Sequence, residues 1–462
     1  MANFINSLHR LLPKHQSCRS FSSIPSLGNS KKPNSYNYNP DPFAAEPLPT
    51  GLQNFPRKTA ACLANSSSRR PPRRVKLLSR EFIEDSLCNP HYGYFATQVE
   101  ILDSPEGGIP FGKLSNLRAL EEEIANRYGP RQSWHTPTEL FKPWYANAVA
   151  RCLLSRHQPN QPLRIYEIGA GNGTLCEGVL NYIRDHAPTL YSQTTYTIVE
   201  VSARLAGIQA ARASRAGHKL EIIPHNVFSL PQEQGTSTSP IESEPCWVIA
   251  MELVDNLARD VVRYDRTTGE VLVASVGTDE NGEFHEFFEP ICDQVNPSLS
   301  RYLQHHQLRS KLTLYDRIMT HLPFAANLSQ AEFVPTRTFE LLEIIRDWFP
   351  NHKLLLSDFD HLPQSIKGIG APVVQTRYEG MTVPCTTYLV QPGRFDIFFP
   401  TDFDDFRKLY HRINPSRPKL QDFSHAEFVS EYHGGDFEKT CLSDGSNPMV
   451  EYYENVKVVV SE

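Results

Sequence analysis

Between residues 164 and 251 the chain alternates short apolar segments with amphipathic segments of helical period, and this order constrains the fold more than any other feature. Helices are predicted over Thr174–Arg184 and Ala203–Ala216. The segments predicted as strands are Arg164–Ile168, Tyr196–Val201, Leu220–Pro224 and Cys246–Met251. Alternating strands and helices predict an α/β fold with a doubly wound, mostly parallel sheet, whose ligands bind at the carboxyl ends of the strands.

The flanking segments add helices before this alternation and a hairpin after it. Apolar side chains at 78, 82, 83 and 87 predict one helix, and a second is predicted over 138–155. Apolar–polar alternation on both sides of the turn at 265–269 predicts an inserted hairpin over 261–275. Further predictions are a helix over 339–348 and strands over 354–356, 386–390 and 456–460.

The N-terminal segment, residues 1–21, has the composition of a mitochondrial transit peptide. No Asp or Glu precedes Asp41, whereas Arg10, Lys14 and Arg19 are interleaved with apolar side chains. An ordinary unstructured N-terminus is the alternative. The rest is predicted to divide into a disordered linker, a helical extension and an α/β domain with an insertion near 261–330. Their ranges are 22–74, 75–160 and 161–462.

Composition excludes several classes of protein. The 46 basic and 52 acidic residues give a net charge of −6, which argues against sequence-blind nucleic-acid binding. No run of 18 apolar residues is present, so no transmembrane helix is predicted. The nine cysteines form no C-x-x-C pair, so we expect neither a disulfide framework nor a metal site. The basic cluster at 69–74 is either a docking site or the solvated end of the linker.

A glycine-rich loop follows the first predicted strand of the alternation. Gly169, Gly171 and Gly173 occupy alternate positions, where glycine lets the backbone turn tightly and approach a ligand. Thr174 stands where a dinucleotide fingerprint needs glycine, and the G-K-[ST] ending of a P-loop is absent. Glu167 would repel a pyrophosphate but suits a ligand with positive charge. The loop therefore favours the ammonium and sulfonium groups of S-adenosylmethionine.

The ends of the next two strands carry side chains that suit a nucleoside. Glu200 and Val201 end the second strand, where a carboxylate can accept hydrogen bonds from both ribose hydroxyls. Asn226 follows the third strand, where a polar side chain could meet the adenine amine. The alternative is that Gly173 only allows close packing and that Glu200 only caps a helix.

Two carboxylates follow the fourth strand and are candidates for catalysis. Glu252 and Asp255 are three residues apart, and one helical turn would place both on one side. Such a pair can bind a guanidinium, localise its lone pair on one nitrogen and accept the proton that arginine loses on methylation. Asp255 as a simple helix cap is the alternative. Asp358, Asp360 and His361 could line the same pocket; the alternative is that Ser357 and Asp358 only end a strand.

These segments together resemble the mitochondrial complex I assembly arginine methyltransferases, a family related to the bacterial MidA-like (DUF185) proteins. The resemblance extends from about 79 to 412. The matching segments are the opening helix at 79–95, the loop at 167–175, the second-strand signature at 199–209, the A-x-E-x-x-D-x-L motif at 250–257, and the landmarks at 357–359, 391–393 and 402–403.

The resemblance implies a class I methyltransferase fold, S-adenosylmethionine as cofactor and a location in the mitochondrial matrix. It further implies a protein substrate, the 49-kDa-type subunit of complex I, which would be dimethylated symmetrically on an arginine. The residues of the predicted site do not themselves distinguish monomethylation from dimethylation. Asn172 replaces an arginine of the family, Leu253 and Val254 replace aromatics, and Ala258 replaces a proline. A non-catalytic assembly chaperone and a small-molecule methyltransferase are therefore alternatives. Insertions of this kind often mediate dimers, so a homodimer is a further candidate.

Overall fold

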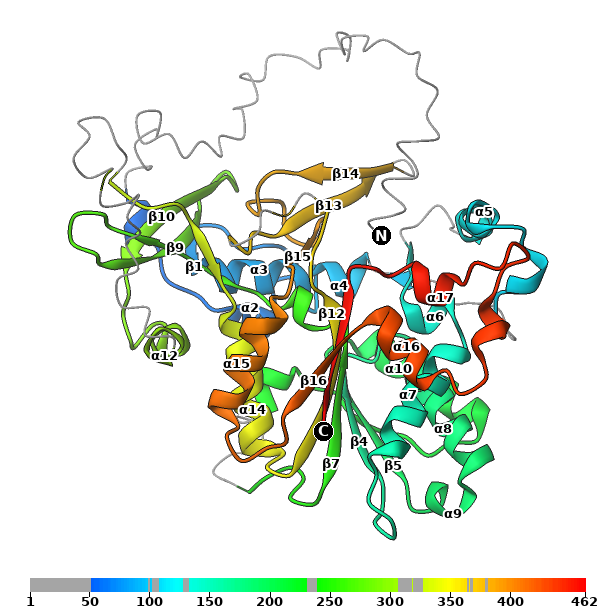
Figure 1. Cartoon of the computed structure of the whole chain (residues 1–462). Helices are drawn as coiled ribbons and strands as arrows, with labels where there is room; N and C mark the ends of the chain where they lie inside the picture. The colour runs from blue at the N-terminus through cyan, green and yellow to red at the C-terminus, as the bar shows by residue number, and fades with distance from the viewer. Residues whose placement is uncertain are drawn as a thin grey trace, which may run out of the picture.

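The computed structural model describes most of the chain from residue 51 to residue 462. The residues in this range that it leaves undescribed are 99, 102–107, 128–132, 231–238, 306–317, 319–326, 364, 366–368 and 379–380. The predicted transit peptide, 1–21, lies outside the described residues. Figure 1 shows a central sheet with helices on both sides, and smaller sheets stacked above one edge of it.

The central sheet has seven strands in the order β16-β17-β12-β7-β4-β5-β6. The strands β4, β5, β6, β7 and β12 are parallel to their neighbours in this set, whereas β17 is antiparallel to both β12 and β16. Their bounds are β4 Arg164–Ile168, β5 Thr195–Val199, β6 Glu221–Ile223, β7 Cys246–Met251, β12 His352–Phe359, β16 Leu420–Ser424 and β17 Val456–Ser461. The α/β prediction is confirmed.

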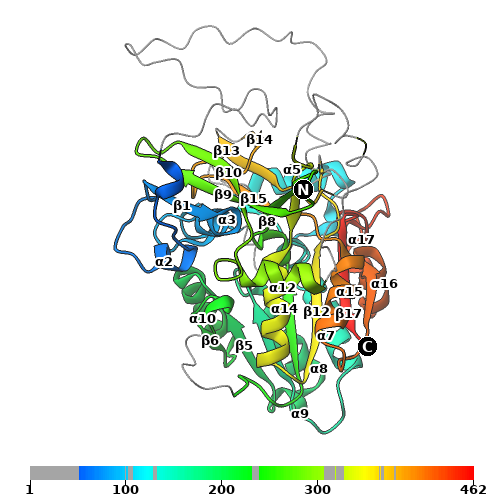
Figure 2. The ribbon, with the colours of Figure 1, turned by 90° about the vertical axis from the view of Figure 1, so that its left-hand side faces the viewer.

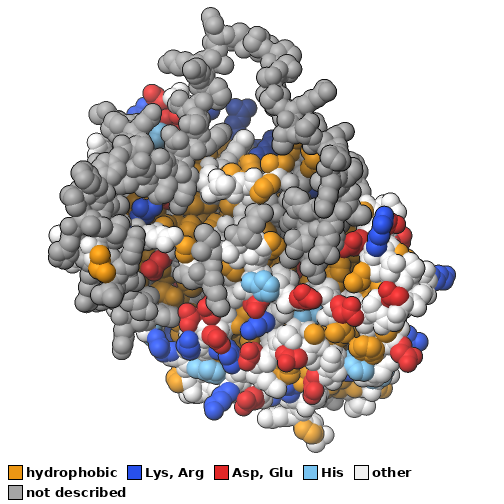
Figure 3. All heavy atoms as spheres, turned by 45° about the horizontal axis from the view of Figure 1, so that its top comes forward, with side chains coloured by type: hydrophobic (Ala, Val, Ile, Leu, Met, Phe, Trp, Pro, Cys, Tyr) orange, Lys and Arg blue, Asp and Glu red, His pale blue; other side chains and the backbone are white. Residues whose placement is uncertain are grey.

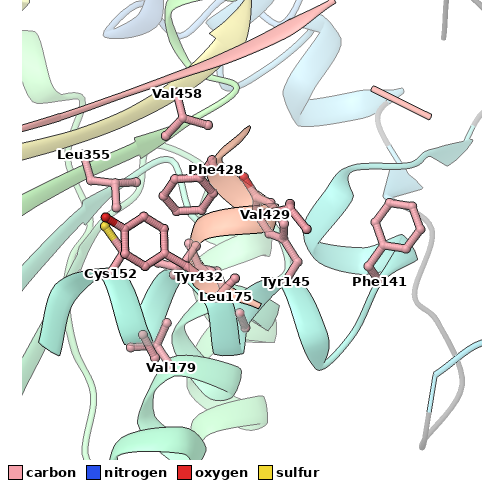
Figure 4. Close-up of a cluster of buried hydrophobic side chains, with 14 of the residues drawn as sticks. Phe141, Tyr145, Cys152, Leu175, Val179, Leu355, Phe428, Val429, Tyr432 and Val458 are labelled. Carbon is pink, nitrogen blue, oxygen red and sulfur yellow. The ribbon is translucent and has the colours of Figure 1, made fainter. Parts of the chain in front are cut away.

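Helices cover both faces of this sheet because its strands are apolar on both faces. Trp247 and Ile249 of β7 lie in one hydrophobic cluster, and Val248 and Ala250 lie in the other. Figure 4 shows part of the first cluster, in which side chains of helices meet Leu355 of β12. The helices of the two clusters are α7 Trp144–Ser155, α8 Thr174–His186 and α16 His425–Tyr432 for the first, and α12 Pro297–His305, α14 Thr336–Trp348 and α15 Phe403–Ile413 for the second. In Figure 2, α12 and α14 lie in front of the central sheet.

A second, antiparallel sheet lies above the carboxyl ends of the central strands (Figure 1). Its members are β1 Val75–Leu78, β8 Asp260–Tyr264, β9 Val271–Thr278, β10 Phe284–Pro290 and β11 Glu332–Val334. Val262 of β8 faces Val273 of β9, so the predicted hairpin is confirmed. The helix expected around residues 78–87 is also confirmed, as α3 Ser79–Cys88, and its Phe82 and Ile83 join the core of this sheet.

A third sheet consists of β13 Val373–Tyr378, β14 Met381–Cys385 and β15 Asp396–Phe398. The strand predicted at 386–390 is wrong, because β14 ends at Cys385 and the next residues are irregular. Tyr388 and Val390 are apolar for another reason: both are buried in the core of the second sheet. Tyr378 and Met381 are instead 64% and 63% exposed. Viewed from above, hydrophobic side chains gather in the middle of this face (Figure 3).

The prediction of a disordered linker over 22–74 is wrong for residues 51–74, the part of this range that the structure describes. Leu52 is fully buried, and an added Cβ on Gly277 of β9 would lie 2.4 Å from its Cδ2 atom. The short helix α2 Ala60–Ala64 begins where the amide of Ala60 donates to Glu81 of α3 (2.7 Å). A proline-rich composition indicates only local conformational preference. The contacts that order this segment are made with residues distant in the chain, so composition did not predict them.

The helix predicted over 138–155 consists of two helices, α6 Pro137–Leu140 and α7. Pro143 lies between them and has no amide hydrogen to continue a helical ladder, which accounts for the interruption. No helix in the described part of the chain is long and apolar enough to cross a bilayer. Further elements are α10 Ala203–Ala216, the 3-10 turns η3 Val227–Ser229 and η4 Val254–Asn256, and α5 Leu117–Arg127.

Candidate active site

The glycine loop connects β4 to α8 at the upper edge of the central sheet. Gly169, Gly171 and Gly173 have φ angles of 73°, 54° and 78°, in the left-handed region that favours glycine. The amide of Gly169 donates to Val199 O of β5 (3.0 Å), which ties the loop to the neighbouring strand. The three predicted glycines therefore have backbone conformations that other residues adopt only with strain.

Glu200 lies directly beside this loop. It is 4% exposed, and its carboxylate accepts hydrogen bonds from Ser202 N and from Gln209 Nε2, both at 2.8 Å. Gln209 Nε2 also donates to Gly171 O (2.8 Å), so one side chain of α10 joins the acid to the loop. The hydroxyl of Ser202 accepts from Leu205 N. The N-cap of α10 is therefore Ser202 and not Glu200.

Glu167 is buried within β4, below the loop. It accepts a hydrogen bond from Tyr196 Oη (2.9 Å), and burial raises the pKa of Glu167 to about 7. The negative charge of Glu200 also raises the pKa of Glu167, so the two predicted acids interact electrostatically. A positively charged group nearby would favour the ionised form of both.

Val201 and Asn226 follow the ends of β5 and β6. Val201 is 46% exposed, which leaves its surface available to a ligand. The Asn226 side-chain oxygen accepts from Phe228 N (3.0 Å) and caps η3. The ends of these strands are joined where Glu200 N donates to Ile223 O (3.1 Å). The structure therefore assigns Asn226 a local capping role and keeps it beside the strand that carries Glu200.

Glu252 occupies a strained position immediately after β7. Its φ angle is 51°, which a residue with a side chain seldom adopts. Its amide donates to Ser357 O of β12 (2.8 Å) and so secures this conformation. The next residue, Leu253, contacts the glycine loop, since an added Cβ on Gly169 would lie 3.1 Å from Leu253 Cδ1. Glu252 is therefore held next to the loop.

Asp255 lies in η4 and is 5% exposed. Its Oδ1 atom is buried and has no hydrogen-bond partner among the described residues, and it caps no helix. Asp358, at the end of β12, holds this turn by accepting from Val254 N (2.7 Å) and Asp255 N (3.1 Å). Asp396 of β15 accepts a long hydrogen bond from Asn256 Nδ2 (3.5 Å). We call Glu252, Asp255, Asp358 and Asp396 the acid cluster.

The members of the acid cluster hold their protons unusually tightly. Burial and the neighbouring Asp358 raise the pKa of Glu252 to about 8. Burial, Asp358 and Glu252 together raise the pKa of Asp255 well above its usual value. Arg259 lies close to these acids, but its own pKa is lowered to about 10 by burial. A cluster of this kind would be stabilised by a cation that enters it.

Asp360 and His361 do not join the acid cluster through any described contact. Asp360 pairs with His361, and its other oxygen lies 3.9 Å from Lys457 Nζ. The His361 side chain is 63% exposed. Of the three further residues that the sequence suggested for this pocket, only Asp358 lies beside Glu252 and Asp255.

Glu139 of α6 supports the glycine loop, and sequence reasoning gave it no role. Its Oε1 atom accepts from Asn172 Nδ2 (3.1 Å) and from Thr174 Oγ1 (2.6 Å), and the residue is 2% exposed. Gln209 is not among the sequence-predicted site residues either, although it lies in the second-strand signature. Thr136 and Pro137 mark the start of a helix just before Glu139, but no local pattern predicts its contact with Asn172, which lies 33 residues away.

We expect Glu139→Ala to loosen the loop. Removal of the carboxylate leaves the buried donors of Asn172 and Thr174 without this acceptor, at a cost of about 1–3 kcal/mol per unsatisfied group. Urea unfolding should show a lower free energy of unfolding, and calorimetry should show weaker binding of S-adenosylmethionine. Glu139→Gln keeps an acceptor oxygen and is expected to fall much closer to the wild type; equal losses in both variants would contradict this role.

The ligand-free chain should become less stable as the pH rises from 6.5 to 8.5. Glu167, Asp358 and Glu252 have pKa values of about 7, 7 and 8 in the folded state, above the 4.5, 3.8 and 4.5 of the free groups. The folded chain therefore binds more protons than the unfolded chain, and its stability falls until these groups have ionised. Urea unfolding at several pH values measures this slope. Glu252→Gln should flatten it, whereas stability that rises over this range would contradict the assignment.

Comparison with known proteins agrees with this geometry. A curated relative is 23% identical in an alignment of 327 positions that covers 65% of this chain and 67% of the relative. It is the "Protein arginine methyltransferase NDUFAF7 homolog, mitochondrial" of Schizosaccharomyces pombe. The resemblance to this family that the motifs indicated is confirmed.

Two solved structures of COG1565 superfamily members from Burkholderia thailandensis share the fold. One, bound to S-adenosyl-homocysteine, is 16% identical with a TM-score of 0.53, and the other is 14% identical with a TM-score of 0.51. Each match covers 90% of this chain and 95% of the other. Residues 145–418 match the Methyltransf_28 family. The chain therefore belongs to this family of S-adenosyl-L-methionine-dependent methyltransferases.

Proposed function

We propose that this chain methylates an arginine of a protein substrate, and that it supports assembly of respiratory complex I in the mitochondrial matrix. One observation carries the proposal: the acid cluster lies beside the glycine loop, and its buried acids, whose pKa values are raised, would ionise when a cation enters. A guanidinium is a planar cation whose N–H groups match such carboxylates.

The residues around the glycine loop fit S-adenosylmethionine. Glycines with positive φ leave room for a ligand against the backbone. The Glu200 carboxylate accepts from Val201 N, Ser202 N and Gln209 Nε2, and with about four lone-pair sites it has capacity left for a ribose hydroxyl. Gln209 Oε1 is buried without a hydrogen-bond partner among the described residues, so the site has a further acceptor to offer. When bound, this cofactor supplies a methyl group on a sulfonium, which a nucleophilic nitrogen can attack.

Glu252 and Asp255 have separate tasks in this proposal. Both would hold the guanidinium, and their negative charge would favour a lone pair on one nitrogen. Glu252 would accept the proton that this nitrogen loses, since a pKa of about 8 suits a base near neutral pH. Asp358 is a positioning residue, because its hydrogen bonds to Val254 and Asp255 fix η4.

A protein substrate is supported by the surface next to the acid cluster. Asp396 lies on β15, which pairs with β13, and β13 continues into the hairpin with β14. This hairpin exposes Tyr378, Met381 and Val383 at 64%, 63% and 39%. Clustered exposed apolar side chains are typical of surfaces that bind another protein. A small-molecule substrate would not need such a surface.

The mitochondrial location is supported by two independent observations. The S. pombe relative is named as mitochondrial, and the first 21 residues here have a transit-peptide composition. The 49-kDa-type subunit of complex I remains the proposed target because of the motif resemblance.

Quantitative mass spectrometry of mitochondrial proteins tests the proposal. Cells lacking this chain should lose dimethylation at one arginine of a complex I subunit, and the wild-type gene should restore it. Unchanged arginine methylation in the deleted cells would contradict the proposal.

A further inference from the structure

A cavity of about 220 Å³ lies at the edge of the central sheet opposite the glycine loop. It is lined by residues at the starts of β4, β7 and β12, among them Arg164, Trp247 and Lys353. This edge is at the bottom of the sheet in Figure 1, close to the C-terminus. The five residues of β4 alone separate the two edges by roughly 16 Å, so the cavity is distinct from the proposed methyl-transfer site.

The lining of this cavity is strongly basic. Arg156, Arg164, Lys353 and Arg417 contribute to it, and none of the described lining residues is Asp or Glu. This concentration of positive charge occurs in a chain whose net charge is −6. Arg164 pairs with Glu242, which lies outside the lining (3.4 Å). The cavity therefore has a local charge opposite to that of the whole chain.

The other three cations are held by neutral groups. Lys353 Nζ donates to Arg156 O (2.9 Å), and Arg417 Nη1 donates to Asn351 Oδ1 (3.2 Å). Arg156 Nη2 donates to Gln421 Oε1 (3.1 Å). Within the described part of the chain, none of these three side chains forms an ion pair with a carboxylate. Their positive charges are therefore available to an anionic ligand.

The charge of Arg156 destabilises the Lys353 ammonium in this cavity. Burial lowers the pKa of Lys353, and the charge of Arg156 lowers it further. The Lys353 ammonium lies 5.6 Å from the centre of the Trp247 ring, which offers it only partial compensation. An anion between the cations would relieve this repulsion.

We propose that this cavity binds a small anion with two linked phosphate groups, either pyrophosphate or the diphosphate end of a nucleotide. Arginine forks and a lysine ammonium are the usual partners of phosphate oxygens. A volume of about 220 Å³ is below the roughly 300–1,000 Å³ of pockets that enclose whole drug-sized ligands. The cavity therefore suits the phosphate groups, with any nucleoside left outside.

Calorimetric titration of the full chain with pyrophosphate tests the proposal, with ADP and citrate titrated at the same ionic strength. We expect one pyrophosphate per chain, at least tenfold weaker binding in Lys353→Met and in Arg417→Gln, and wild-type binding in Lys408→Met. Lys408 is an exposed lysine on α15 that pairs with Asp405, so it is a matched control for loss of charge. S-adenosyl-homocysteine binding by each variant shows that it is folded.

ADP binding as tight as that of pyrophosphate would identify a nucleoside diphosphate as the ligand, and weaker ADP binding would identify free pyrophosphate; both support the proposal. Failure of folded wild-type protein to bind pyrophosphate at millimolar concentration would overturn it. Equal affinity for citrate, or binding that survives both cavity substitutions, would also overturn it.

Discussion

Replacing Glu252 with glutamine is expected to reduce arginine methylation by about 10²- to 10⁴-fold, the usual contribution of a positioned general base. Glutamine retains the shape of the side chain but neither carries a negative charge for the guanidinium nor accepts its proton. S-adenosylmethionine affinity should change less than threefold, because Glu200 and the glycine loop are intact. The measurement combines calorimetry on the purified variant with mass spectrometry of cells that express only this variant.

The control for this substitution is Asp360→Asn, which removes a carboxylate after the neighbouring strand β12 without touching the acid cluster. This variant should methylate like the wild type. Persistent methylation in Glu252→Gln cells would contradict the catalytic role of Glu252. Complex I assembly that survives without methylation would instead show that the chain acts as a non-catalytic chaperone, as its departures at Asn172, Leu253 and Ala258 allow.

Replacing Glu200 with glutamine is expected to weaken S-adenosylmethionine binding by roughly 10- to 100-fold. A hydrogen bond to a charged group contributes about 1.5–3 kcal/mol, and the amide of glutamine can accept at only one of the two positions. The variant would also place a donor amide against Ser202 N or Gln209 Nε2, each of which now donates to the carboxylate. Calorimetric titration of both proteins gives the ratio of dissociation constants.

Glu221→Gln is the matched control for this second prediction. Glu221 is an exposed acid at the start of β6, the strand that pairs with β5. Its substitution therefore removes one negative charge from the same sheet. Its S-adenosylmethionine affinity should equal that of the wild type. A Glu200→Gln variant that binds as tightly as Glu221→Gln would show that Glu200 makes no contact with the cofactor.

Local sequence pattern predicts the elements of the central layer closely. The bounds predicted for β4 and α10 agree with the structure residue for residue. These elements have strong local signals: a short apolar run that ends in glycines, and an amphipathic segment between Ser202 and Gly217, which are its two caps. The strand ends then bring the loop, Glu200 and Glu252 to one edge, as the order of a parallel sheet requires.

Contacts between distant segments were not predictable in the same way. β1 pairs with β9 across about 200 residues, and Leu52 packs against Gly277 although its surroundings are rich in proline. Asp396 reaches the acid cluster from β15, and no motif in the sequence marks it as a partner of Asp255. Each of these features depends on packing in three dimensions, which composition and periodicity do not encode.

The central claim is that the glycine loop and Glu200 hold the cofactor. A crystal structure of the chain with S-adenosyl-homocysteine tests it most directly. We predict that both ribose hydroxyls lie about 3 Å from the Glu200 carboxylate and that the ligand passes over the backbone of Gly169–Gly173. A ligand bound elsewhere, with no contact to either, would contradict the account.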